Sequence, residues 1–288
     1  MYKVVTKRFL NDAKTICLFE IEAPLVAKHA QAGQFVIFRL DEQGERVPVS
    51  VAGWDREKGT VTVMVQAAGR TTRMLHTVEQ GDYITDFVGP LGKATEMEGL
   101  KKVCVVGGGV GCAIAYPIAK EMHKLGIDVT FIGGFRSADI VILKDELKEV
   151  SDKLIICTDD GSYGEKGFTT KYLQDEIDAN IREGKPQFDR VIAIGPDIMM
   201  KFLADVTRPY GIKTIISLDP IMVDGTGMCG GCRVIVGGET KFACVDGPDF
   251  DAHEVDFDSL LKRAAFYKEE QDEEAKHICR MTGGHRNG

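Results

Sequence analysis

The first hundred residues alternate between apolar and polar positions in short runs, which are separated by turns rich in Gly, Asp and Glu. This period-two alternation with regularly spaced turns is typical of a small antiparallel barrel or sandwich. We therefore predict an N-terminal antiparallel β-barrel over residues 1–98. Its expected strands are Tyr2–Val5, Thr15–Ile21, Gln34–Arg39, Val47–Ala52, Thr60–Gln66 and Tyr83–Val88.

The pattern changes after a break at Gly89–Gly92 and a polar connector. From Lys101 onward, continuous apolar runs alternate with stretches of helical periodicity. Alternating strand and helix over about a hundred residues favours a doubly wound parallel sheet, which we assign to residues 99–217. The expected strands are Val103–Val106, Asp128–Gly133, Leu154–Thr158, Arg190–Ile194 and Lys213–Ser217, and the first helix is Ile114–Leu125.

The remaining residues form two further segments. A short Gly/Cys-rich segment covers residues 218–250, and an acidic tail covers residues 251–288. Within the tail, Phe257–His277 has the pattern of an amphipathic helix whose charges form a solvated face.

Composition excludes several classes of function. The chain has 36 basic and 44 acidic residues, giving a net charge of −8, and it has no Lys/Arg-rich run, so it lacks the basic footprint of a nucleic-acid-binding protein. No apolar stretch reaches the roughly 18 residues that span a bilayer. Met1–Leu10 is charged and strand-like, unlike a signal peptide, so we expect a cytoplasmic protein. Disulfides are then the less expected use of the eight cysteines, and Cys104 and Cys157 should be core residues.

The Gly/Cys-rich segment carries the most specific motif. Asp224 is followed by four residues and Cys229, by two more and Cys232, and by eleven more and Cys244. Plant-type [2Fe–2S] loops use C-x4-C-x2-C with a distant fourth cysteine. The chain has this frame with aspartate in the first position, and its glycines let the backbone wrap tightly. We predict a [2Fe–2S] cluster held by Asp224, Cys229, Cys232 and Cys244.

Two alternatives remain open for this segment. A zinc knuckle usually pairs two short Cys or His hooks, but here the second hook is missing and the nearest histidine, His253, lies beyond Cys244. The fourth cluster ligand could instead be Asp219 or Cys279. Asp224 is preferred because it occupies the motif spacing itself.

Two motifs in the barrel half predict a flavin site. The planar fork of an arginine suits pyrophosphate, and Arg46 precedes Pro48-Val49-Ser50 on an expected strand. Backbone amides and threonines that open a helix suit an anion, and Ala68–Thr72 has this form. For each motif alone, a surface turn is an equally good interpretation. The candidate flavin residues are Arg46, Pro48, Val49, Ser50, Gly69, Thr71 and Thr72.

A glycine run predicts a nucleotide site in the second domain. It follows the strand Val103–Val106 and precedes a helix, which is the context of a dinucleotide phosphate loop. Cys112 stands where the last glycine of G-x-G-x-x-G would be, so the motif is a variant. Arg136 could contact the 2′-phosphate of NADP(H) or be a surface residue. The candidate nucleotide residues are Gly107, Gly108, Gly109, Gly111, Asp159, Asp160, Gly195 and Pro196.

Taken together, these motifs resemble the ferredoxin–NADP reductase-like superfamily, and in particular its branch with a C-terminal [2Fe–2S] segment. That branch includes the electron-transfer subunit of dihydroorotate dehydrogenase, the sulfide dehydrogenase beta subunit and the small (alpha) subunit of NADH-dependent reduced ferredoxin:NADP oxidoreductase. The resemblance covers almost the whole chain. Arg46 lies four residues before Ser50, whereas many members have the arginine three before. Asp224 in place of a cysteine resembles the last two members of the branch.

The resemblance implies an FAD-binding barrel, an NAD(P)-binding α/β domain and a cytoplasmic heterodimer. NAD(H) would reduce FAD, and single electrons would pass through the cluster to a larger flavin/[4Fe–4S] subunit that serves ferredoxin, as in electron bifurcation. A flavin is needed because a nicotinamide gives two electrons and a cluster accepts one. No catalytic side chain is expected, since hydride transfer depends on ring orientation. The alternatives are the electron-transfer subunit of dihydroorotate dehydrogenase and a non-catalytic iron–sulfur module.

Overall fold

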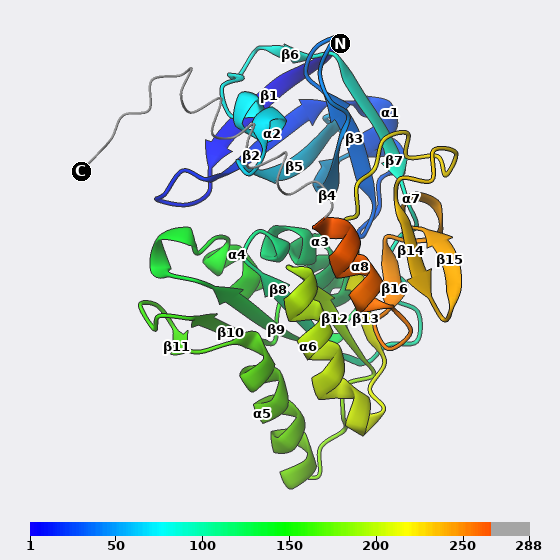
Figure 1. The fold of residues 1–288 in the computed structure, drawn as a ribbon. Helices are drawn as coiled ribbons and strands as arrows, with labels where there is room; N and C mark the ends of the chain where they lie inside the picture. Colours follow the sequence, from blue (N-terminus) through cyan, green and yellow to red (C-terminus); the bar gives the residue numbers. More distant parts are fainter. Residues whose placement is uncertain (266–288) are drawn as a thin grey trace, which may run out of the picture.

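A computed structural model describes residues 1–265 and has a β-barrel at one end and a parallel α/β domain at the other (Figure 1). The barrel sheet has the order β6-β1-β2-β5-β4-β3-β7, and all its pairings are antiparallel. Its strands are β1 (Tyr2–Phe9), β2 (Ile16–Glu22), β3 (Phe35–Arg39), β4 (Val47–Asp55), β5 (Thr60–Gln66), β6 (Tyr83–Ile84) and β7 (Asp86–Leu91), and its helices are α1 (Pro24–His29) and α2 (Arg70–Leu75).

The alternation seen in the sequence builds the barrel core. Phe19, Val36 and Phe38 are almost fully buried and pack in one apolar cluster, while Phe35 and Ile37, which alternate with them on β3, belong to the cluster shared with the second domain. The single strand expected at Tyr83–Val88 is in fact two strands. The amide of Thr85 donates to the carbonyls of Arg39 and Leu40, which breaks the strand and sends β7 to the opposite edge of the sheet.

The second domain is built on a sheet with the order β11-β10-β9-β8-β12-β13-β16, in which β16 alone runs antiparallel to its neighbour. Its first strands are β8 (Lys102–Gly108), β9 (Asp128–Phe135), β10 (Lys153–Thr158), β11 (Glu165–Lys166), β12 (Arg190–Ile194) and β13 (Thr214–Ser217). Its helices are α3 (Gly111–Lys124), α4 (Lys144–Glu149), α5 (Thr169–Arg182) and α6 (Asp197–Thr207), with short 3-10 turns at Ala138–Ile140 and Arg208–Tyr210.

Helices cover both faces of this sheet. Buried residues of α3 and α4 belong to one apolar cluster, and those of α5 and α6 belong to another. A sheet buried on both faces explains the continuous apolar runs of the sequence. Cys104 and Cys157 are fully buried in the sheet, as expected. The predicted barrel followed by a doubly wound parallel domain is confirmed.

The Gly/Cys-rich segment joins two strands of the same sheet. It leaves β13, forms a long loop beside β7 (Figure 1), and continues through a hairpin and a short helix before the chain returns to the sheet as β16. These elements are β14 (Arg233–Val236), β15 (Glu239–Phe242), α7 (Ala243–Asp246) and β16 (Asp249–Asp251), followed by α8 (Phe257–Ala264).

Within residues 1–265 the expected tail helix is present as α8, which begins at Phe257 as predicted. The rest of the expected helix, to His277, and the alternative ligand Cys279 lie outside the described residues. No helix in the described part of the chain is both long and apolar enough to cross a membrane.

Candidate functional site

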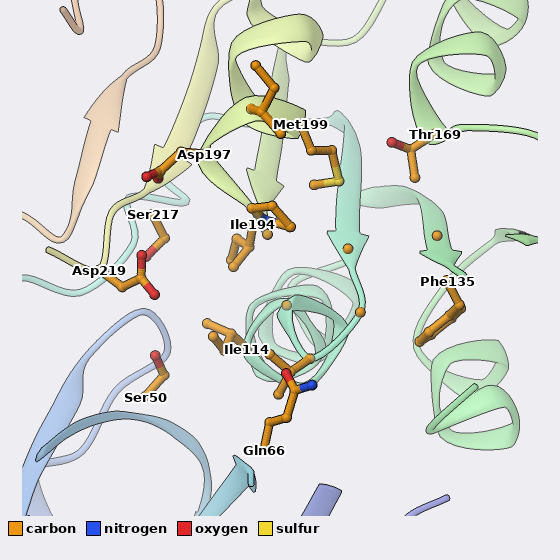
Figure 2. Close-up of a pocket in the computed structure, with 18 of the residues that line it drawn as sticks. Ser50, Gln66, Ile114, Phe135, Thr169, Ile194, Asp197, Met199, Ser217 and Asp219 are labelled. Atoms are coloured by element: carbon orange, nitrogen blue, oxygen red, sulfur yellow. The ribbon is translucent and has the colours of Figure 1, made fainter. Parts of the chain in front are cut away.

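A large cleft separates the barrel from the carboxyl ends of the parallel strands. Its volume is about 1120 Å³, and residues from both domains line it. Figure 2 shows Ser50 and Gln66 on the barrel side of the cleft, facing Ile194 and Met199 of the second domain. Ligands of open α/β sheets bind at this edge of the sheet, so the topology alone marks the cleft as a binding site.

The glycine turn at the end of β8, Gly108–Gly111, forms the floor of the cleft. A Cβ on Gly108 would lie 2.5 Å from the sulfur of Met199, and one on Gly111 would lie 2.2 Å from the carbonyl oxygen of Ile194. The contact at Gly111 is with the backbone of β12, which cannot move aside as the Met199 side chain can, so only glycine permits this close approach. Gly109 has φ +56°, and a Cβ there would meet nothing within 4 Å. The turn therefore exposes bare backbone to the cleft at the start of α3, which suits the phosphates of a dinucleotide.

The two sides of the cleft differ in chemistry. Phe135 and Thr169 lie on one side, beyond the glycine turn, while Asp197, Ser217 and Asp219 lie together on the other (Figure 2). Desolvation, and then the neighbouring Asp219 carboxylate, raise the pKa of Asp197 to about 6. The cleft thus carries an acidic side where β12 and β13 end.

The structure brings nine of the predicted cofactor residues into this one cleft. They come from the barrel strand β4, the glycine turn and the ends of β10 and β12. They are Pro48, Val49, Ser50, Gly108, Gly109, Gly111, Asp159, Gly195 and Pro196.

Two other predicted nucleotide residues lie next to the cleft but do not line it. Gly107 is buried in β8, and a Cβ there would lie 2.7 Å from the Cα of Cys112. The carboxylate of Asp160 accepts hydrogen bonds from the amide and hydroxyl of Ser162, at 2.9 and 2.6 Å. Both residues shape the turns that carry the lining residues.

The remaining predicted flavin residues lie away from the cleft lining. The hydroxyl of Thr72 accepts hydrogen bonds from the amides of Ala68 and Gly69, each at 3.0 Å, and that of Thr71 donates to Glu45. The side chain of Thr72 therefore occupies the amides that were expected to bind an anion. Arg46 donates to main-chain carbonyls of the Gly/Cys-rich segment.

Several lining residues were not predicted from the sequence. Gln66, Phe135 and Ser217 are each the last residue of a strand, β5, β9 and β13 respectively. The strand-end rule that selected Asp159 and Gly195 also applies to Phe135 and Ser217, so a signal for them existed. Met199 lies within α6 and Pro248 directly precedes β16, so the strand-end rule does not select them and only the folded chain brings them to the cleft.

The predicted cluster ligands form two pairs. The sulfurs of Cys232 and Cys244 lie 3.2 Å apart, and both residues are buried. Asp224 and Cys229 form the second pair, because one carboxylate oxygen of Asp224 accepts from the amide of Cys229 at 2.7 Å. The other oxygen accepts from the amide of Thr226 at 2.8 Å, and these hydrogen bonds, with the Cys229 thiol, lower the pKa of Asp224.

This arrangement fits a binuclear cluster better than a single metal ion. Within residues 1–265, no three His, Cys, Asp or Glu side chains converge on one metal-ion position. A [2Fe–2S] cluster instead takes two protein ligands on each of its two irons. One buried thiol pair and one adjacent carboxylate–thiol pair match this requirement. Asp219, the alternative ligand, lines the cleft.

Comparison with known proteins identifies the family. Residues 219–256 match the iron–sulfur cluster binding domain of dihydroorotate dehydrogenase B. A Thermotoga maritima homologue of the dihydroorotate dehydrogenase B (NAD(+)) electron transfer subunit is 48% identical, covering 94% of each chain. This chain belongs to that family of electron-transfer subunits. A probable member from Methanocaldococcus jannaschii is 36% identical over 85% of this chain and 87% of its own length.

A solved structure extends the likeness to three dimensions. The structure comes from a study of flavin-based electron bifurcation by NADH-dependent reduced ferredoxin-NADP oxidoreductase. It is 46% identical, has a TM-score of 0.86, and the match covers 96% of this chain and 98% of that one. The resemblance inferred from the sequence motifs is therefore confirmed, as is the expectation of an electron-transfer oxidoreductase subunit.

Proposed function

We propose that this chain is the small subunit of an electron-bifurcating, NADH-dependent ferredoxin:NADP oxidoreductase. It takes electrons from NAD(H), with NADP(H) as the alternative nucleotide, and passes them through FAD and a [2Fe–2S] cluster to a larger partner subunit. Bound FAD supplies the conversion of a two-electron hydride donor into single electrons. The observation that carries the proposal is the presence, in one chain, of a two-domain cleft and a paired ligand set beside it.

The residues of the cleft have separate tasks in this proposal. The glycine turn at Gly108–Gly111 holds the nucleotide phosphates against bare backbone. Ser50 lines the barrel side of the same cleft (Figure 2), and its hydroxyl is the proposed hydrogen-bond partner of the flavin ring. Because hydride transfer needs two rings at a fixed distance and angle, the main work of the chain is to orient them. No acid or base among these residues is assigned a proton transfer.

The cluster segment lies on the route out of the cleft. Met222, close to the candidate ligand Asp224, also lines the cleft. Cys229 is exposed at the surface, whereas Cys232 and Cys244 are buried. A cluster held by these residues would therefore have the Cys232–Cys244 pair on its buried side and would present Cys229 on the side open to a partner. A larger subunit with its own FAD and [4Fe–4S] clusters, serving ferredoxin, completes the proposed heterodimer.

The bifurcating assignment rests on Asp224, because percentage identity does not separate the two candidates. The solved structure from the study of the bifurcating reductase is 46% identical, and the Thermotoga maritima homologue of the dihydroorotate dehydrogenase subunit is 48% identical. Aspartate at the first ligand position resembles the bifurcating and sulfide dehydrogenase subunits, whereas the dihydroorotate branch has a cysteine there. An electron-transfer subunit of dihydroorotate dehydrogenase is the second candidate, favoured by the match of residues 219–256.

An anaerobic titration of the purified chain with NADH tests the proposal. We expect flavin and [2Fe–2S] absorption in the oxidised protein, bleaching of the flavin by NADH, and then an electron paramagnetic resonance signal from the reduced cluster. Cluster bands without flavin would support the non-catalytic iron–sulfur module instead. Co-purification with dihydroorotate-oxidising activity would favour the second candidate. A cytoplasmic location is also part of the proposal.

A further inference from the structure

The side chain of Arg46 does not line the cleft, although the sequence motif predicts that it binds a flavin pyrophosphate. Its Nε donates to the carbonyl oxygen of Val223 at 2.6 Å, and a terminal nitrogen donates to the carbonyl oxygen of Asp224 at 3.5 Å. Both acceptors are main-chain atoms at the first ligand position of the cluster segment. The arginine therefore links residues that are 177 and 178 positions apart in the chain.

The spacing of the motif explains the difference. In the resembling family the arginine stands three residues before the serine, a position that Val47 occupies here. Val47 packs against the apolar core of the barrel, so no guanidinium is available at that position. Side chains alternate along a strand, so a shift by one residue sends the arginine to the other side of the chain. Arg46 thereby reaches the cluster loop.

The barrel also contacts the loop next to this point. Gly225 has φ +76°, and a Cβ there would lie 2.7 Å from Leu91 of β7 and 2.8 Å from Ile37 of β3. The loop therefore packs closely against the barrel at Gly225, and Val223 and Asp224, directly before it, accept hydrogen bonds from Arg46. Arg46 directly precedes β4, the strand that carries Ser50 into the cleft.

We propose that Arg46 is a positioning residue for the [2Fe–2S] cluster and not a ligand of the flavin phosphates. Its guanidinium fixes the main chain at Val223 and Asp224, so that the carboxylate of Asp224 stays beside Cys229. Its fixed positive charge lies next to the first ligand position, and it favours the reduced cluster, which carries one more negative charge. The inference rests on the proposed function only in that the segment holds a cluster.

Three variants test this assignment. Arg46→Gln removes the positive charge. Arg46→Lys keeps the charge but loses the planar guanidinium that bonds two carbonyls. Arg39→Gln is the matched control for removing a barrel arginine. Arg39 lies at the end of the barrel strand β3, but its Nε donates to the carboxylate of Asp86 at 2.6 Å and not to the cluster loop. The measurements are amide hydrogen exchange over residues 221–229 of the cluster-free chain, FAD content, and the cluster potential from a redox titration followed by electron paramagnetic resonance.

We expect exchange over residues 221–229 to rise about tenfold in both Arg46 variants, since each loses charge-assisted hydrogen bonds. The cluster potential should fall in Arg46→Gln and fall less in Arg46→Lys, with FAD content unchanged in both. Arg39→Gln should change neither the exchange nor the potential. Unchanged exchange, or loss of FAD with an unchanged cluster potential, would overturn the assignment. A wild-type chain that takes up no cluster would contradict the proposed function, while the exchange experiment would still report on Arg46.

Discussion

The sulfur atoms of Cys232 and Cys244 lie 3.2 Å apart, although eleven residues separate them in the sequence. The hairpin of β14 and β15 creates this proximity, because Arg233 pairs with Phe242 and the amide of Ala243 donates to the carbonyl of Cys232. The two thiols are therefore held together by the fold before any cluster binds. Burial and the neighbouring Cys232 raise the pKa of the Cys244 thiol to about 12, so cluster insertion must displace thiol protons.

This pairing predicts that the two buried thiols are equally necessary. Cys232→Ser and Cys244→Ser should each lose the [2Fe–2S] absorption and the acid-labile sulfide while keeping flavin. Cys104→Ala is the matched control, because Cys104 is equally buried but lies in the parallel sheet. It should retain the full cluster. A Cys244→Ser chain with wild-type sulfide content would show that a ligand outside this pair completes the site.

Asp224 is predicted to act both as a ligand and as a cap of the loop. Asp224→Ala should lose the cluster, because it removes a donor and frees the amides of Thr226 and Cys229. Asp224→Cys should keep a cluster with an altered electron paramagnetic resonance spectrum and a lower potential, since a thiolate donates more electron density than a carboxylate.

Asp246 provides the control for the capping role of Asp224. Its carboxylate accepts from the amide of Phe242 at 2.7 Å in the same segment, but it is not a proposed ligand. Asp246→Ala should loosen the segment and leave the spectrum of the bound cluster unchanged. If Asp224→Ala behaved like Asp246→Ala, the ligand assignment would fall and Asp224 would be only a cap.

The sequence predicts those parts of the molecule that depend on local periodicity or fixed spacing. The strand Thr60–Gln66 and the motif from Asp224 to Cys244 are of this kind, since each can be read within one segment. The direction of Arg46 could not be predicted, because its partners lie 177 and 178 residues away and become neighbours only after both domains pack. The acidic pair Asp197 and Asp219 was missed for the same reason, since two elements must meet to create it.

A buried carboxylate predicts how stability changes with pH. Asp249 on β16 accepts a hydrogen bond from the hydroxyl of Thr95 at 2.6 Å, while its other oxygen has no partner among the described residues. Burial raises the pKa of Asp249 from 3.8 to about 6, although Thr95, Ser217 and Arg190 oppose the shift. The folded state therefore binds the proton more tightly, so this group contributes stability below pH 3.8 that is lost as the pH rises through 6. The shift corresponds to about 3 kcal/mol.

Asp249→Asn should therefore stabilise the chain at pH 7.5 by about 1 kcal/mol or more, with a smaller gain at pH 5, because the amide carries no buried charge. Urea unfolding at the two pH values measures this. Asp258→Asn is the control of opposite sign, since Lys201 lowers the pKa of the exposed Asp258. A gain from Asp249→Asn that was the same at both pH values would contradict the assignment.

Alanine substitutions at two glycines of one turn are predicted to have different effects, one on stability and the other on NADH binding. A Cβ at Gly111 would lie 2.2 Å from the carbonyl oxygen of Ile194, so Gly111→Ala should destabilise folding by about 3 kcal/mol or more. Gly109 has open space around it and φ +56°, so Gly109→Ala should lower the free energy of unfolding by only about 1 kcal/mol.

The methyl group added by Gly109→Ala would occupy the cleft where nucleotide phosphates are proposed to lie. Gly109→Ala should therefore weaken NADH binding by about tenfold or more in a chain that unfolds nearly as the wild type does. Thermal unfolding and NADH binding, measured on both variants, separate the two effects. Wild-type NADH affinity in Gly109→Ala would place the phosphates elsewhere in the cleft.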